Sequence, residues 1–184
     1  MTDQSSLIRT DSPLARERHV VQFYESEDAL CAAAAKSVAR RARMGQAILL
    51  LASGAHRAMI VEELRANGID PNRCEFVDAR ELLAACTAGG SLDEDRLRQD
   101  LYRIVTAAVK SAESVTVYGE LVDMLIAGAH GAAALRLEDL WNELIQVHPI
   151  SLLCSHALAH FHGAGGGSLL DEVCRRHDGV NPVA

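Results

Sequence analysis

Short apolar runs separated by longer helical patterns are the feature that most constrains how this chain can fold. The runs at 47–52 and 150–154 are mainly apolar rather than half-exposed alternations, so both are expected to be interior strands of a sheet. Similar runs predict strands at 19–23, 74–77 and 115–118. Because helical segments lie between these strands, the sequence predicts an α/β fold, a three-layer sandwich with a mostly parallel central sheet.

Helix signals fill the intervals between the predicted strands. Ser26 is a good N-cap and is followed by two acidic residues, so a helix is expected to begin there. Ser91 opens a capping box with Glu94, which predicts a helix at 92–111. Further helices are expected at 56–67, 120–128, 132–147 and 169–176, the last preceded by a glycine-rich flexible joint at 163–167.

Length and charge limit the classes of function. A chain of 184 residues suits one domain, which we expect at 19–182 after a flexible N-terminal arm at 1–18. The 18 basic and 25 acidic side chains give a net charge of −7, which disfavours direct binding to nucleic acid or to an anionic membrane. No apolar run approaches the ~20 residues of a membrane-spanning helix, and the opening residues lack a signal peptide's hydrophobic segment. A cytoplasmic location is therefore expected.

Cysteine and histidine spacing gives no strong metal signal. The five cysteines are widely spaced without a C-x-x-C pair, so buried free thiols are expected rather than disulfides or a zinc ribbon. His156 and His160 are four residues apart, which would place both on one face of a helix, and His162 lies close by. No acidic third ligand has a supporting spacing, so a solvated or capping histidine group is favoured over a metal site.

The residues that follow the predicted strands are where a ligand would bind, because the crevice of an open α/β sheet lies beyond the carboxyl ends of its strands. The loop after 47–52 reads LASGAHRAM, whereas a phosphate-binding loop needs G-x-x-x-x-G-K-[ST]. ATP hydrolysis is therefore not expected. A dinucleotide fingerprint is also missing after every predicted strand.

Nucleophilic catalysis has two weak candidates, Cys154 with His156 and Ser53 with His56. The chain has no G-x-S-x-G elbow and no identifiable third residue, and neighbours on a strand are expected to point to opposite faces. We therefore expect the protein not to be an enzyme.

The few aromatic residues allow two interpretations. Tyr24 and Tyr118 end predicted strands and Trp141 lies within a predicted helix, so they either wall an apolar pocket or fill the core. Glu120 and Asp123 follow Tyr118 at the start of a helix, where the helix dipole favours carboxylates, so their first expected role is capping.

Several ordered segments resemble the MEDS domain, the methanogen/methylotroph sensory domain, over about residues 19–182. These segments are HVVQFYESEDAL, GQAILLLASGAHRAMIVEEL, VYGELVDMLIAGAHGAAALRLEDLWNELIQVHPISLLCSHAL and VCRRHDGVNP. The positions that match the family motifs are His19, Gln22, Phe23, Tyr24, Tyr118, Gly119, Glu120, Asp123, Glu138, Trp141, Asn142, Cys154 and His177.

The resemblance implies a fold similar to RecA/KaiC-type ATPases with a degenerate nucleotide-binding loop. It also implies a sensor of small carbon compounds that signals through a regulatory partner protein, a kinase or a transcription regulator. The residues expected to bind the ligand are His19, Tyr24, Tyr118, Glu120, Trp141 and His156.

Two other functions stay open at this stage. One is a residual nucleotide-binding or phosphotransfer enzyme of RecA-like fold, and the other is an interaction protein without a ligand. No cofactor can be assigned from the sequence, and a homodimer is compatible with the base rate for soluble oligomers.

Overall fold

A six-stranded, entirely parallel sheet organises the chain. The computed structural model describes residues 18–87 and 91–181, so all but the last residue of the predicted N-terminal arm lies outside the described residues. The strands are β1 (His19–Tyr24), β2 (Ala47–Ala52), β3 (Cys74–Asp78), β4 (Val115–Gly119), β5 (Ile150–Ala157) and β6 (Gly179–Asn181). Their order across the sheet is β3-β2-β4-β5-β1-β6. The predicted α/β fold and its five predicted strands are confirmed.

The order of the strands puts the most apolar segments inside the sheet. β2 pairs with β3 and β4, and β5 pairs with β4 and β1, so both strands are interior as predicted. The sixth strand was not predicted, because β6 has only three residues and no apolar run. It forms as an edge strand by pairing in parallel with β1, with Val21 opposite Val180.

The helices follow the predicted intervals with two corrections. Their bounds are α1 (Glu27–Arg43), α2 (Gly54–Ala66), α3 (Ala79–Ala85), α4 (Glu94–Lys110), α5 (Leu121–Ala127), α6 (Gly131–Val147) and α7 (Gly166–Arg175), with 3-10 turns η2 (Pro71–Arg73) and η3 (Leu158–Phe161). Ser26 caps α1 as predicted. The N-cap of α4 is Asp93 rather than Ser91, because its carboxylate accepts the backbone N–H of Arg96 at 3.0 Å. The short helix α3 was not predicted.

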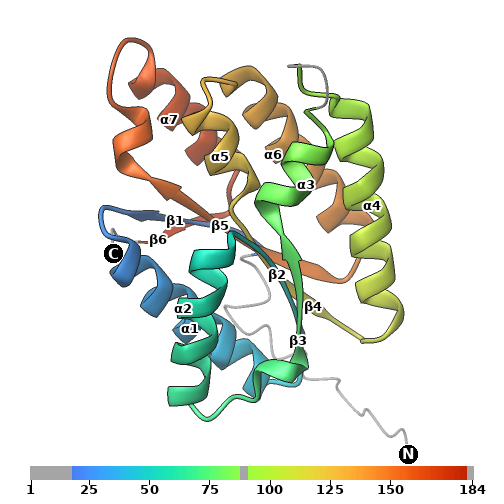
Figure 1. Cartoon of the computed structure of the whole chain (residues 1–184). Helices are drawn as coiled ribbons and strands as arrows, with labels where there is room; N and C mark the ends of the chain where they lie inside the picture. Colours follow the sequence, from blue (N-terminus) through green and yellow to red (C-terminus); the bar gives the residue numbers. More distant parts are fainter. Residues whose placement is uncertain (1–17, 88–90, 182–184) are drawn as a thin grey trace, which may run out of the picture.

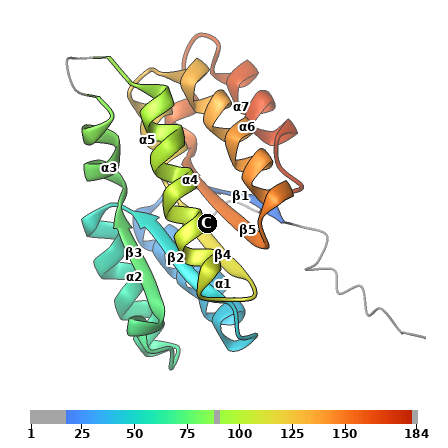
Figure 2. The same cartoon turned by 90° about the vertical axis from the view of Figure 1, so that its right-hand side faces the viewer.

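Helices cover both faces of the sheet, which makes three layers (Figures 1 and 2). α1 and α2 pack on one face, against Ile48, Leu50 and Tyr118. The other helices lie on the opposite face, where α4 contributes Leu101 and α6 contributes Trp141 to the larger core. Strand periodicity decides this division, since alternate side chains of a strand point to opposite faces. Within the described residues no helix is long and apolar enough to span a membrane.

The glycine-rich stretch at 163–167 forms the turn before α7 and the first two residues of that helix. Gly165 is the N-cap of α7 with a φ of +81°, a left-handed conformation that favours glycine. Gly166 lies against the preceding turn, where an added Cβ would come within 1.7 Å of the carbonyl oxygen of Phe161. This segment therefore needs glycine for a close backbone approach as well as for chain reversal.

Candidate functional site

A cavity of about 520 Å³ opens where several strands end. Tyr24 is the last residue of β1, Ser53 follows β2, and Glu120 follows β4. These residues form a polar floor together with Glu27, His56, Arg80, Thr87, Asp123 and His160. The wall is apolar and comes from α3 and α5, which contribute Leu83, Ala84, Met124 and Ala127. We call this feature the strand-end cavity.

Glu120 is the best-connected residue of the cavity floor. Its carboxylate accepts the backbone N–H of Ser53 at 2.9 Å, the Nδ1–H of His56 at 2.8 Å and the hydroxyl of Tyr118 at 2.9 Å. The contacts form because β2 and β4 are neighbours, which brings their two following loops together. The hydrogen bond to Glu120 raises the pKa of His56 above its ordinary value of 6.5.

The same carboxylate occupies the N-terminus of α2, where a bound phosphate would otherwise find free N–H groups. Ser53 is the N-cap of α2, and helix N-termini attract anions through free N–H groups and the helix dipole. Here the N–H of Ser53 is already bonded to Glu120, and the Ser53 hydroxyl accepts the N–H of His56 at 3.3 Å. An internal anion thus satisfies this end of the helix and repels a second one.

Asp123 links the cavity to the end of β5. Its Oδ1 accepts the backbone N–H of Ala157 at 3.0 Å and the Nδ1–H of His160 at 2.8 Å, while its Oδ2 accepts the Tyr24 hydroxyl at 3.3 Å. Burial opposes the charge of this carboxylate, but the bonds and ion pairs with its two histidine neighbours outweigh burial and lower the pKa of Asp123 below 3.8. Burial and Asp123 together raise the pKa of Tyr24 well above its usual range.

A second polar group lies in the core beneath the cavity, around the fully buried Glu138 of α6. His156 joins the two regions, with its Nδ1 3.8 Å from Asp123 Oδ1 and its Nε2 3.3 Å from Glu138 Oε1. Burial works against a charged imidazole here, but the two carboxylates outweigh it and raise the pKa of His156 to about 9. The two carboxylates on either side of the ring therefore favour the protonated form of His156.

The remaining members of this group surround the other oxygen of Glu138. His19 Nε2 lies 3.2 Å from Glu138 Oε2, His177 Nε2 lies 3.6 Å from it, and Cys154 Sγ lies 3.8 Å from it. We call His19, Glu138, Cys154, His156 and His177 the Glu138 cluster. Burial raises the pKa of the Cys154 thiol well above its ordinary value and lowers the pKa of His177 to about 4.

Two expectations about histidine and cysteine are wrong. Cys154 and His156 do not point to opposite faces, because β5 continues to Ala157 and residues two apart on a strand share a face. His156 and His160 do not lie on one helix, since the first is in β5 and the second is in η3. The described cysteines are all free, and four of the five are buried, as predicted.

The structure divides the six residues expected to bind a ligand between different places. Tyr24 and Glu120 line the strand-end cavity, and Tyr118 lies directly beneath it, bonded to Glu120. His19 and His156 belong to the Glu138 cluster instead. Trp141 is fully buried in the core between α6 and the sheet, which supports a packing role.

Of the thirteen residues that line the cavity, the predicted ligand set contained only Tyr24 and Glu120, and it missed His56, Arg80 and His160 among others. Their signal in the sequence is their position in or just after the loops that follow strands, which sequence reasoning noted without assigning the side chains a role. Asp123 was assigned to capping, yet its carboxylate bonds residues of β1, β5 and η3.

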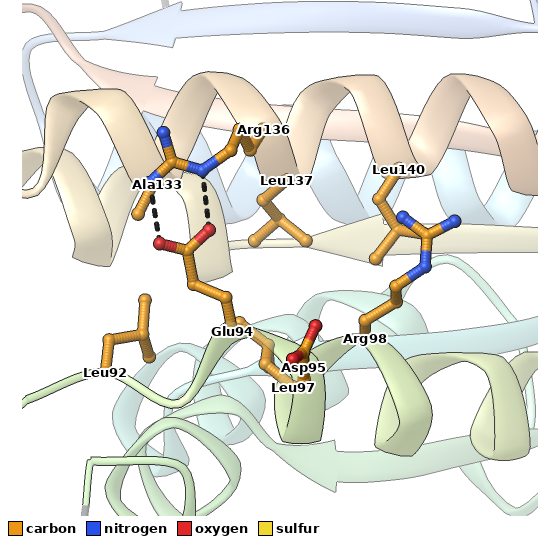
Figure 3. A pocket seen from close by; sticks show the side chains of 9 residues that line it. All are labelled: Leu92, Glu94, Asp95, Leu97, Arg98, Ala133, Arg136, Leu137 and Leu140. Carbon is orange, nitrogen blue, oxygen red and sulfur yellow. Dashed lines mark hydrogen bonds and ion pairs between the residues drawn. The ribbon is translucent and has the colours of Figure 1, made fainter.

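A second, smaller cavity of about 200 Å³ lies between α4 and α6 (Figure 3). Its floor is apolar, with Leu97, Leu137 and Leu140, and its rim is charged. On this rim Arg136 holds both oxygens of Glu94 at 2.6 Å. Because these charges satisfy one another and the cavity lies in the helix layer, away from the strand ends, it is a weaker candidate for ligand binding.

The fold and the cavity together indicate where a ligand would bind. In open α/β sheets ligands bind beyond the carboxyl ends of the strands, which is where the strand-end cavity lies. A comparison with protein-family models matches residues 18–178 to the MEthanogen/methylotroph, DcmR Sensory domain, MEDS. The match covers most of the chain, so the chain belongs to the MEDS family and has a sensory domain. A search of curated proteins finds no match.

Proposed function

We propose that this MEDS domain binds a small molecule in the strand-end cavity and signals its presence to a partner protein. The observation that carries the proposal is the cavity itself, about 520 Å³ in volume and formed at the carboxyl edge of the sheet in a domain of a sensory family. The cavity is large enough for a compound of a few carbon atoms, and its lining comes from at least five separate elements. A ligand placed there would contact several of them.

The chemistry of the lining favours a small amphiphilic carbon compound with a hydroxyl or amino group. The floor carries the carboxylates of Glu27, Glu120 and Asp123, which accept hydrogen bonds from such groups. The wall formed by Leu83 and Met124 suits an apolar carbon skeleton. Nucleotides are disfavoured, because the Glu120 carboxylate already occupies the helix N-terminus where a phosphate would bind.

Asp123 offers a route by which ligand binding changes the surface. Its carboxylate bonds both the end of β5 and His160 in η3, the turn that leads to α7. A ligand that competes for this carboxylate would favour a second arrangement of η3, provided that it binds the two arrangements with different affinity. We propose that a kinase or a transcription regulator recognises this region, and that the domain acts as a sensor rather than as an enzyme.

The test combines native mass spectrometry with a thermal-shift screen. The native mass of the purified protein, compared with its denatured mass, reports a retained compound and whether the chain forms a homodimer. The screen covers small alcohols, amines and carboxylic acids, with ATP and Mg²⁺ as a separate arm. A true ligand at 100 times its Kd stabilises the native state by about 2.7 kcal/mol, which raises Tm by roughly 5–10 °C for a domain of this size.

A matched pair of variants on α3 locates the binding site. Ala84 lines the cavity and Ala85 does not, although both are exposed. Ala84→Trp is expected to abolish the ligand-dependent shift in Tm, whereas Ala85→Trp is expected to keep it. An equal shift in Tm in both variants would place the ligand elsewhere. A shift with ATP alone would favour the nucleotide-binding alternative. A native mass without any bound compound, together with no shift in Tm from any compound, would refute the ligand-binding function.

A further inference from the structure

Four side chains with metal-ligating atoms converge in the core beside α6, outside the strand-end cavity. His19 comes from β1, Glu138 from α6, Cys154 from β5 and His177 from the segment between α7 and β6. One ligand atom of each lies within 4.8 Å of the ligand atoms of the other three. The four side chains are buried, so no bulk water competes for these atoms.

Four of the six separations between these atoms are close to the edges of a tetrahedron around a metal ion. Glu138 Oε2 lies 3.2 Å from His19 Nε2 and 3.6 Å from His177 Nε2. Cys154 Sγ lies 3.5 Å from His19 Nε2 and 3.8 Å from Glu138 Oε2. A tetrahedral zinc ion with bonds of about 2.0–2.3 Å keeps its ligand atoms about 3.3–3.8 Å apart. The site thus needs little rearrangement to hold an ion of this size.

The hydrogen bonds of the two imidazoles leave both Nε2 atoms facing the centre of the group. His177 Nδ1 donates to the backbone carbonyl of Val173 at 2.8 Å. His19 Nδ1 donates to Asn142 Oδ1 at 2.9 Å, and the orientation of that amide is determined by its own Nδ2, which donates to a backbone carbonyl at 3.1 Å. Because Nδ1 is the donor in both rings, each Nε2 faces Glu138 Oε2, where a shared cation would interact with all three atoms.

Unpaired atoms point the same way. Among the described residues, His177 Nε2 has no hydrogen-bond partner, although its side chain is fully buried. Buried polar atoms usually have a partner, and an exception calls for an explanation. A metal ion at the centre of the tetrahedron would supply a partner for this nitrogen, whereas His19 Nε2 already has the Cys154 thiol at 3.5 Å.

The surroundings have the form that metal sites require. Histidine ligands almost always donate their second N–H to a carbonyl or carboxylate oxygen, as His19 and His177 both do. The outer oxygen of Glu138 faces His156 Nε2 at 3.3 Å, which orients the carboxylate. One thiolate and one carboxylate also balance the two positive charges of a divalent ion, so the buried site would carry no excess charge.

We propose that His19, Glu138, Cys154 and His177 form a tetrahedral binding site for Zn²⁺. Binding would form four bonds to the metal and release the Cys154 thiol proton to solvent. Because all four positions are taken by protein side chains, the site has the closed coordination of a structural zinc centre and lacks the open position of a catalytic one. The ion would tie the segment after α7 to β1, β5 and α6, and so hold the short edge strand β6 in place.

Cobalt(II) is the probe for this site, because tetrahedral Co²⁺ absorbs in the visible and a thiolate ligand adds a charge-transfer band in the near ultraviolet. Purified full-length protein is treated with a chelator, checked by circular dichroism and titrated with Co²⁺. We expect both bands to saturate at one ion per chain and to disappear when one equivalent of Zn²⁺ is added. Cys154→Ser should lose the charge-transfer band, and Glu138→Gln should weaken binding at least tenfold. Cys174→Ser, which changes a free cysteine outside the group, should leave both bands unchanged.

A readout by metal content covers the case in which a variant or the stripped protein fails to fold. Elemental analysis of the untreated protein should then find one zinc ion per chain, and unfolding on chelation with refolding on addition of Zn²⁺ would support the site. Absence of zinc from the untreated protein together with no Co²⁺ bands would overturn the proposal, as would a charge-transfer band that persists in a folded Cys154→Ser variant. None of these results depends on an organic ligand in the strand-end cavity, so this proposal and the sensory proposal fail separately.

Discussion

Replacing Glu120 by glutamine tests whether a single buried carboxylate holds the cavity floor together. The side chain accepts three hydrogen bonds, from Ser53, His56 and Tyr118. In Glu120→Gln the amide oxygen can replace one carboxylate oxygen and keep its hydrogen bonds. The amide N–H₂ group replaces the other oxygen and cannot accept, so a donor that bonded that oxygen is left unpaired. An unpaired buried donor costs about 1–3 kcal/mol, and losing the charge weakens the remaining bonds by about 1 kcal/mol more. We expect a total destabilisation of about 2–4 kcal/mol.

The pH dependence gives this experiment a second, independent readout. Glu120 raises the pKa of His56 in the native state above 6.5, so the imidazole binds its proton more tightly in the folded than in the unfolded protein. The resulting stabilisation is fully present below pH 6.5 and is lost as pH rises through the native pKa of His56. The stability difference between the wild type and Glu120→Gln should therefore be largest below pH 6.5 and should narrow above it.

Urea unfolding at several pH values measures both effects. The single tryptophan, Trp141, is fully buried, so its fluorescence reports unfolding. Glu27→Gln is the matched control, because Glu27 lies 3.8 Å from the same imidazole but its side chain is 73% exposed. It should cost less than about 0.5 kcal/mol. A loss below about 1 kcal/mol in Glu120→Gln, or a difference from the wild type that does not change with pH, would refute the reasoning.

Three further predictions concern other parts of the fold. Gly166→Ala should destabilise the protein by about 3 kcal/mol, because the added Cβ would clash with the backbone of Phe161. Gly167→Ala has open space around it and should be neutral or stabilising by about 0.5 kcal/mol. Equal effects of the two substitutions in thermal unfolding would contradict the close approach of Gly166 to Phe161. Leu101→Ala should cost about 2–5 kcal/mol and Ile104→Ala, which is only partly buried, clearly less, as measured by urea unfolding; the reverse order would place the wrong face of α4 on the sheet. Asp123→Asn should reduce the loss of stability on acidification. A carboxylate with a lowered pKa stabilises the fold above its ordinary pKa of 3.8 and loses this contribution as pH falls through its native pKa. An acid-unfolding curve that is the same as that of the wild type would argue against the lowered pKa of Asp123.

Local patterns predicted most elements of the fold because their causes are local. The apolar run at 47–52 becomes β2 without any change of bounds, and Ser26 caps α1 through its own side chain. The prediction failed where local signals compete or are too short. Ser91 and Asp93 are both good capping residues, and packing selected the second, while β6 is a three-residue strand that exists only because β1 offers it an edge.

The candidate sites were less accessible to sequence reasoning. Tyr24 and Glu120 were expected near a ligand because they follow strands, and both do line the cavity. His19 and His156 were assigned to the same site because they also lie in or next to strands. Their side chains instead face α6 and contact Glu138. Which face of the sheet a strand residue points to depends on its position in the alternation along the strand. For His156 this position follows only when the C-terminal end of β5 is known.

What the sequence by itself determined is the class of the fold, the family to which the chain belongs, and the elements that carry each polar residue. Only the tertiary structure decided which of these residues meet. β4 lies between β2 and β5, so Glu120 reaches Ser53 and His56. α6 packs on the face of β5 beside β1, so Glu138 reaches His19 and Cys154. The physical reason is that hydrophobic periodicity and capping act over a few residues, whereas strand order and helix packing are set by the burial of a common core from segments far apart in the chain.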